Sequence, residues 1–79
     1  MLLEIVTPDR KVFEGEVTSV MVPGTNGTFQ MLNNHAAIIS TLINGQVKIH
    51  TGSGEETFDV KGGVVEMLTN KVIILAESA

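Results

Sequence analysis

Turn-forming residues interrupt this chain every few positions, and no stretch between them carries the period of a helix. The intervening segments are short, rich in Val, Ile and Phe, and in places strictly alternating, as in Gln46–His50. Many short strands joined by Gly- and Asn-rich turns are typical of a sandwich or a barrel. We therefore predict an all-β fold. Specifically, we expect a β-sandwich of two mostly antiparallel sheets, with about ten short strands and no C-terminal helices.

Two local signals predict details of this fold. Along Glu16–Val22 the alternation changes phase, because Val17 faces the opposite way from Val20 and Val22. A phase change inside a strand predicts a β-bulge. Further on, Asn44-Gly45 predicts a hairpin closed by a two-residue turn, since both residue types accept positive φ.

The length of 79 residues predicts one domain, residues 1–79. A chain of this size buries only about 60% of its unfolded surface, so its core is small. It has no cysteine, so packing must replace disulfides. The predicted core consists of inward-facing strand residues: Ile5, Val12, Phe13, Val20, Val22, Phe29, Val47, Ile49, Phe58, Val60, Val65, Met67, Val72 and Ile74.

Charge and composition exclude several function classes. The formal net charge of −4 disfavours nucleic acid as a ligand, and three Phe without Trp or Tyr offer few stacking platforms. The first residues lack the charged region and apolar run of a signal peptide. No segment provides about 20 consecutive apolar residues to span a bilayer. These features predict a soluble cytoplasmic protein.

Charged residues are distributed unevenly. None lies between Val17 and Val47, whereas all of the Asp, Glu, Lys and Arg residues flank this uncharged segment. Two explanations are open at this point. Either the central strands are buried on both faces, or part of the segment contacts another protein, because interface cores are depleted of charge.

A search for chemistry finds no convincing constellation. Ser19 and the other serines have no G-x-S-x-G context and no His and acid nearby in sequence. His35 and His50 fall on different strands, and Glu55-Glu56 would point to opposite faces of one strand. The Gly24–Gly27 segment lacks the Lys and the helix of a phosphate loop. We expect no catalytic, metal-binding or cofactor-binding residues, and no bound cofactor.

One residue suggests an alternative function. Lys71 follows the turn residues Thr69 and Asn70 in a β-rich chain of about 80 residues. Biotinyl and lipoyl carrier domains have a modified Lys beside such a turn, commonly flanked by Met. No Met-Lys-Met occurs here, and a lysine at a strand edge also serves to discourage unwanted pairing.

Six segments, in order and with matching gaps, resemble the N-terminal domain of the epsilon subunit of F-type ATP synthases. They are Leu3-Glu-Ile-Val-Thr-Pro8, Val12-Phe-Glu-Gly-Glu-Val17, Val22-Pro-Gly-Thr-Asn-Gly27, Asn34-His-Ala36, Gly62-Gly63 with Val65-Glu66, and Asn70-Lys-Val72 with Leu75-Ala76. The resemblance covers nearly the whole chain. It implies a sandwich of two five-stranded sheets at the foot of the central stalk. It also implies a non-catalytic rotor subunit that couples proton or sodium flow to ATP synthesis.

The resemblance further implies two partners, the gamma subunit and the membrane-embedded c-ring. We expect the hairpin tip Thr25, Asn26, Gly27 and Thr28 to contact the c-ring. We expect the gamma contact to be made by Asn34, His35, Ala36, Ala37, Ile38 and Thr41. The implied location is the cytoplasmic face of the bacterial inner membrane, as a peripheral component without insertion into the bilayer.

This chain departs from the family pattern at three places. Many members have an acidic residue at the position of Thr28 and a Pro at that of Ala37. Most continue beyond the position of Ala79 into a helical hairpin that can inhibit ATP hydrolysis and in some members binds ATP. We therefore expect this chain neither to bind ATP nor to inhibit hydrolysis by extending helices.

Overall fold

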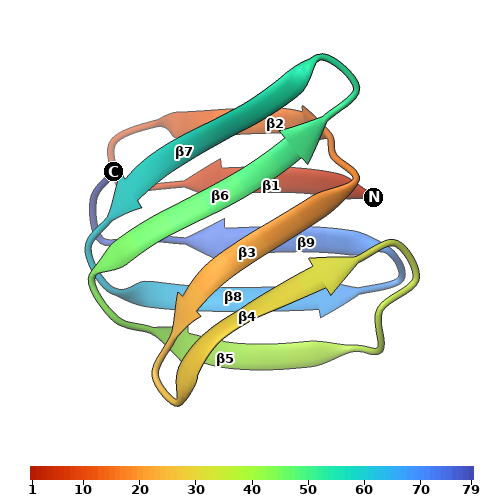
Figure 1. The fold of residues 1–79 in the computed structure, drawn as a ribbon. Coiled ribbons are helices and arrows are strands. Elements are labelled where there is room, and N and C mark those ends of the chain that lie inside the picture. Colours follow the sequence, from red (N-terminus) through yellow and green to blue (C-terminus); the bar gives the residue numbers. More distant parts are fainter.

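The computed structural model describes all residues, 1–79, and contains nine strands and no helix (Figure 1). The absence of helical periodicity in the sequence is therefore matched by the fold. The strands are β1 (Leu2–Val6), β2 (Lys11–Glu16), β3 (Ser19–Gly24), β4 (Gly27–Leu32), β5 (Ile38–Leu42), β6 (Gly45–Thr51), β7 (Gly54–Val60), β8 (Gly63–Leu68) and β9 (Lys71–Leu75).

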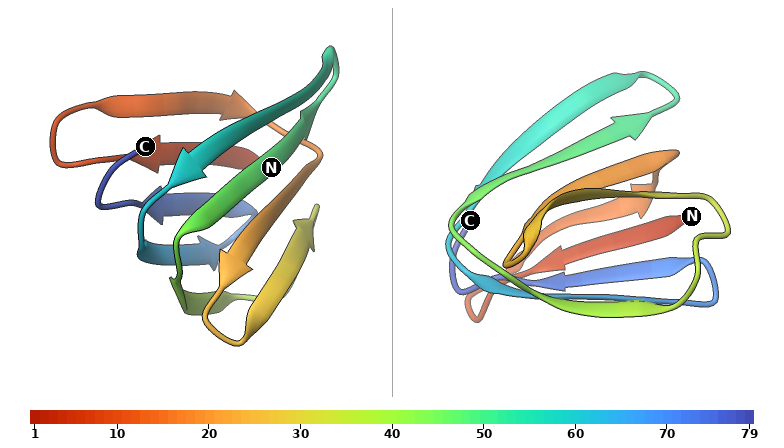
Figure 2. Two further views of the ribbon diagram at one scale, coloured as in Figure 1. Left: turned by 60° about the vertical axis from the view of Figure 1, so that its left-hand side comes forward. Right: turned by 60° about the horizontal axis from the view of Figure 1, so that its bottom comes forward.

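The strands form two layers that face each other across the core (Figures 1 and 2). One layer has the order β2-β1-β9-β8-β5 and the other β4-β3-β6-β7. A single bridging pair, Gly24 and Leu42, joins β3 to β5 at one corner. The predicted all-β sandwich is confirmed. Its second layer contains four strands, where the family resemblance implied five.

Strands β1 and β9 lie side by side and run parallel, from the Leu2–Lys71 pair to the Val6–Leu75 pair. Every other ladder is antiparallel. The pairing places the first and last strands in the middle of one layer, between β2 and β8. The chain ends therefore contribute central strands of the domain.

The core is one cluster of 16 buried residues between the layers. Every predicted core residue belongs to this cluster or packs against it, with Val12, Phe13, Phe29 and Phe58 only partly buried. The aromatic residues are less buried than predicted because Phe13 and Phe58 lie on edge strands, where nothing covers their outer side. The prediction omitted Met1, Leu3, Val17, Met31, Leu42 and Ala76, which are also buried.

The predicted bulge between Glu16 and Val22 is wrong. Strand β2 ends at Glu16 and β3 begins at Ser19 in the opposite layer, so Val17 lies in a crossing segment. Its N–H donates to the Met1 carbonyl at 2.9 Å, and its side chain is buried. The change of phase thus reflects a change of sheet.

The predicted hairpin at Asn44-Gly45 is also wrong, for a similar reason. Strands β5 and β6 belong to different layers and do not pair, and neither turn residue has positive φ. A Cβ at Gly45 would lie 2.9 Å from Cβ of Pro23. Glycine therefore permits close approach of β6 to β3 at this crossing.

Candidate interaction surface

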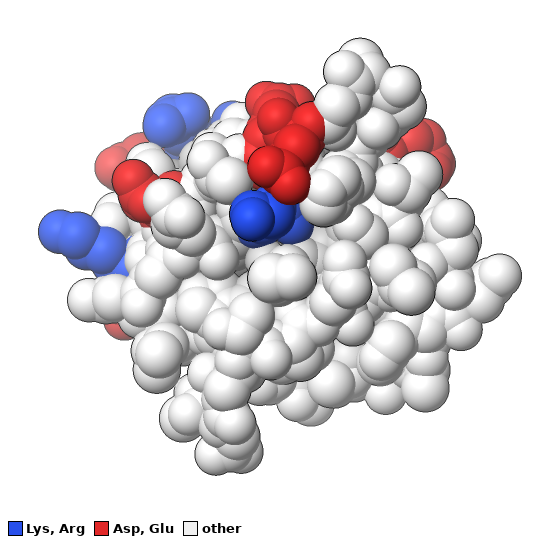
Figure 3. Space-filling view, viewed as in Figure 1, with Lys and Arg blue, Asp and Glu red and all other residues white.

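The uncharged segment Val17–Val47 forms one side of the sandwich. Only β3 is mostly buried, whereas β4 and β5 lie at layer edges with several exposed side chains. Burial on both faces therefore does not explain the lack of charge in β4 and β5. In Figure 3 the lower part of the surface, where these two strands lie in Figure 1, shows neither acidic nor basic side chains.

The tip expected to contact the c-ring is a tight turn between β3 and β4. Gly24 pairs with Gly27, leaving Thr25 and Asn26 as the two turn residues, all exposed except Gly24. Thr25 donates from both its backbone N–H and its Oγ1 to the carbonyl of Thr41, each at 3.0 Å. These bonds hold the tip against the end of β5.

The loop expected to contact gamma lies at the other end of β4 (Figure 1). Asn34 adopts a left-handed conformation with φ of 62°, and its N–H donates to Oδ1 of Asn70 at 2.9 Å. The Nδ1 atom of His35 lies 2.8 Å from the Ala36 carbonyl, so it carries the proton in this contact. The loop is exposed, yet anchored to the β8–β9 turn.

The structure thus divides the predicted site residues between the two ends of β4. Thr25 to Thr28 lie at one end, and Asn34 to Ala37 at the other. Ile38 follows directly and is half-buried at the start of β5. Thr41 was expected on the gamma face, but its carbonyl contacts the tip.

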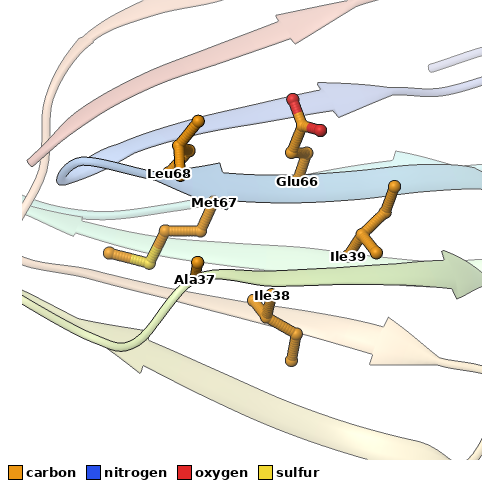
Figure 4. A pocket seen from close by; sticks show the side chains of 6 residues that line it. All are labelled: Ala37, Ile38, Ile39, Glu66, Met67 and Leu68. Carbon is orange, nitrogen blue, oxygen red and sulfur yellow. The ribbon is translucent and has the colours of Figure 1, made fainter.

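A third feature was missed in the sequence: the outer face of the β2-β1-β9-β8-β5 layer exposes large apolar side chains. Ile39 is 69% exposed, Leu68 61% and Leu75 54%. Two adjoining hollows of about 260 and 310 Å³ share Ile39 and Glu66. Glu66 makes no ion pair and stands among these apolar groups (Figure 4).

Figure 4 shows Ile39, Glu66 and Leu68 on one side of strands β5 and β8, and Ile38 and Met67 on the other. This arrangement follows from the period of two along each strand. Sequence patterning did contain this signal, because Leu68 and Ile39 occupy positions that alternate with core residues. Several adjoining apolar residues on the solvent side of such a pattern indicate a contact surface.

The structure also assembles a Ser–His–Glu chain that sequence spacing did not indicate. Nδ1 of His50 lies 2.9 Å from Oγ of Ser19, and Nε2 lies 2.9 Å from Oε2 of Glu55. The three side chains come from β3, β6 and β7. Ser19 is only 6% exposed, so most of it is shielded from solvent. These two contacts between side chains link the neighbouring strands β3, β6 and β7.

Lys71 lies directly after the β8–β9 turn, but its side chain is paired with a neighbouring strand. The two residues at the tip of the β8–β9 turn are Thr69 and Asn70, with φ of 53° and 59°. Lys71 is the first residue of β9, and its Nζ lies 3.2 Å from Oε1 of Glu4 on the neighbouring β1. This ion pair links β9 to β1 and gives Lys71 a structural role.

The remaining charged side chains form no metal site. No group of three or more His, Asp or Glu side chains is gathered in a way that would hold a metal ion. The structure contains no helix with the length and apolar character needed to cross a bilayer. The structure is a β-sandwich domain with an uncharged side and an apolar outer face.

Comparison with known proteins identifies the family. The family model described as "ATP synthase, Delta/Epsilon chain, beta-sandwich domain" matches residues 1–79. The ATP synthase epsilon chain of Chlorobaculum tepidum is 43% identical over 76 residues, covering 95% of this chain and 86% of that protein. That of Maridesulfovibrio salexigens is 46% identical over 79 residues, 100% of this chain and 56% of that protein. The chain belongs to this family.

Solved structures show the same fold at low sequence identity. A chain of the Euglena gracilis mitochondrial ATP synthase, in a structure of OSCP, F1 and c-ring, superposes with a TM-score of 0.92 at 18% identity. A chain from the central stalk and c-ring of the Tetrahymena thermophila mitochondrial enzyme gives 0.80 at 20% identity. This chain is covered to 99% and 96%, but spans only 51% and 62% of those chains.

Proposed function

We propose that this protein is the epsilon-type subunit of an F-type ATP synthase, a non-catalytic part of the central-stalk rotor. One observation carries the proposal: family membership extends over the whole of residues 1–79, with relatives named ATP synthase epsilon chain at 40–46% identity. In this role it links a gamma subunit to the c-ring and couples ion-driven rotation to ATP synthesis.

The fold suits a mechanical task. A coupling subunit must pass torque between partners without deforming, and close-packed interiors have low compressibility. The 16-residue core between two layers supplies such a body, and no buried side-chain N or O atom lacks a hydrogen-bond partner. Surfaces that bind partners, and not a pocket for chemistry, are what this role requires.

The two ends of β4 supply the proposed contacts. The tip Thr25–Thr28 is exposed, uncharged and held by Thr41, so it can press on the c-ring as a fixed projection. Thr28 has a hydroxyl where the family resemblance implies an acid in many members, so its contact would be a hydrogen bond. The loop Asn34–Ala37, with Ile38 and the rest of the β5 edge, would face gamma.

The site of action in this proposal is the cytoplasmic face of a bacterial inner membrane. The subunit would be held there through its protein partners, without inserting into lipid. Neither ATP nor nucleic acid would bind to residues 1–79. The net charge of −4, and an uncharged side without Lys or Arg, disfavour binding of nucleic acid.

Single cysteines test the assignment directly, because the natural chain contains none. In the assembled complex, cysteine at Thr28 should crosslink to a c subunit and cysteine at His35 to gamma. Cysteine at Thr57, exposed on the opposite edge strand β7, is the control and should crosslink to neither. Reaction of all three with small soluble reagents alone would refute the surface assignment.

A second measurement tests the role itself. Complexes purified from the native membrane should contain this chain together with gamma and the c-ring. Vesicles whose enzyme lacks it should lose proton-coupled ATP synthesis, which returns when the chain is added back. If the chain instead carries covalently bound biotin or lipoate at Lys71, its intact mass will exceed that of the polypeptide, and the rotor role is wrong.

A further inference from the structure

The edges of the two layers differ in how they are protected. Natural sheets discourage unwanted pairing by placing charged residues or proline on their edge strands. Two of the edge strands here follow this rule, β2 with Lys11, Glu14 and Glu16, and β7 with Glu55, Glu56 and Asp59. The edge strand β4 has no charged residue and no proline over Gly27–Leu32. Its unprotected edge requires an explanation.

The backbone of β4 offers unused hydrogen-bonding groups along this edge. Strand β4 pairs only with β3, and ladder bonds alternate between the two sides of a strand. The Leu32 carbonyl accepts the His35 N–H at 3.1 Å, so it points away from β3. By alternation, the N–H and carbonyl groups of Thr28 and Gln30 point to the same open side. These groups form a template for another strand.

Apolar side chains at the open side indicate what such a strand would carry. Phe29 on β4 and Ile38 on β5 face the core but are only half-buried, because no further strand covers them. The two layers diverge here from the corner where Gly24 meets Leu42 (Figure 2). A strand paired with the open edge of β4, carrying apolar residues at alternate positions, would cover the exposed parts of Phe29 and Ile38.

We propose that the open edge of β4 is a strand-addition site. It would receive an extended, uncharged segment of the stalk partner, paired backbone to backbone with Gln30 and with the N–H of Leu32. This mode gives affinity through main-chain bonds and selectivity through alternate side chains. The inference rests on the proposed function, since it takes the strand to come from the partner that carries this subunit.

A second copy of the chain fits the edge less well than a partner strand. Its own β4 already directs Phe29 and Met31 into its own core, and Met31 is fully buried. These side chains are therefore not free to cover Phe29 and Ile38 of another copy. The absence of charge also extends beyond the edge to the partly exposed strand β5, as expected for the centre of a larger interface.

A proline pair tests the proposal. Gln30→Pro removes an N–H that points to the open side, so the fold should persist, as proline is tolerated on edge strands. Thr57→Pro is the matched control, because counting from the Thr51–Gly54 pair places its N–H on the open side of β7. With purified gamma subunit, Gln30→Pro should bind about tenfold or more weakly than the natural chain, and Thr57→Pro equally well.

Hydrogen exchange in the natural complex provides an independent measurement that needs no variant. The amides of Gln30 and Leu32 should exchange rapidly in the free chain and become protected in the complex. Protection confined to the outer face around Glu66, or unchanged binding by a folded Gln30→Pro chain, would overturn strand addition. A homodimer that Gln30→Pro dissociates would overturn the choice of occupant. Failure of the natural chain to bind gamma would refute the proposed function instead.

Discussion

Alanine substitutions at Gly63 and Gly27 together test how much stability depends on the close approach of Gly63 to Leu75 and Ala76. Both have positive φ, 127° and 126°, so alanine at either position meets the same backbone strain. Their surroundings differ completely. A Cβ at Gly63 would overlap the backbone carbonyl oxygen of Leu75 and lie 2.9 Å from Cα of Ala76. A Cβ at Gly27 would have nothing within 4 Å.

These contacts set the expected magnitudes. Strain at such φ costs on the order of 1–3 kcal/mol, partly offset by about 0.4–1 kcal/mol because alanine restricts the unfolded chain. Gly27→Ala should therefore lose about 1–2 kcal/mol. At Gly63 the clash is with backbone, which cannot rotate away, and overpacking adds about 1–3 kcal/mol or more. We expect a loss of about 2–5 kcal/mol for Gly63→Ala.

A domain of this length has roughly 4–12 kcal/mol of stability in total, at about 0.05–0.15 kcal/mol per residue. Gly63→Ala should thus lose a large share of the stability of the domain. Urea titration followed by far-ultraviolet circular dichroism measures both variants, since the chain has no Trp or Tyr for fluorescence. If the two alanine variants lose equal stability, close packing at Gly63 does not matter and this reasoning is refuted.

Two further predictions concern the layers. The hydrogen bond from Lys71, and then the charge of Lys11, hold the pKa of Glu4 below the ordinary value of 4.5. Its contribution to stability is complete above the pKa of the unfolded chain and is lost as pH falls through the lower folded value. Lys71→Met should therefore raise the Glu4 pKa in a carbon-detected NMR titration, whereas Lys61→Met, which removes a lysine without an ion pair, should not. Phe58→Ala should cost about 2–4 kcal/mol in the same urea assay, below the range for a fully buried Phe, because Phe58 is half-buried and loses one edge-to-face contact with Phe13 at 5.7 Å. Equal stability with the natural chain would show that the two edge strands do not need this contact.

The strands and most of the core could be predicted from the sequence because they depend on local patterns. Alternation in Gln46–His50 fixes which side chains of β6 face inward, and the Gly24–Gly27 turn joins neighbours in the chain. The family could be recognised for the same reason, since its turn and strand segments keep their order and spacing. The uncharged segment was visible as well, although its position in the fold was not.

Only the tertiary structure decided how the strands are shared between layers. A change of phase at Val17 and a turn signal at Asn44-Gly45 read as a bulge and a hairpin, because local sequence does not distinguish turning back from crossing over. The parallel pairing of β1 with β9, and the contact of Ser19 with His50, join residues far apart in sequence. Such contacts arise when both layers bury their apolar faces against each other, and that shared burial determines which edges stay open.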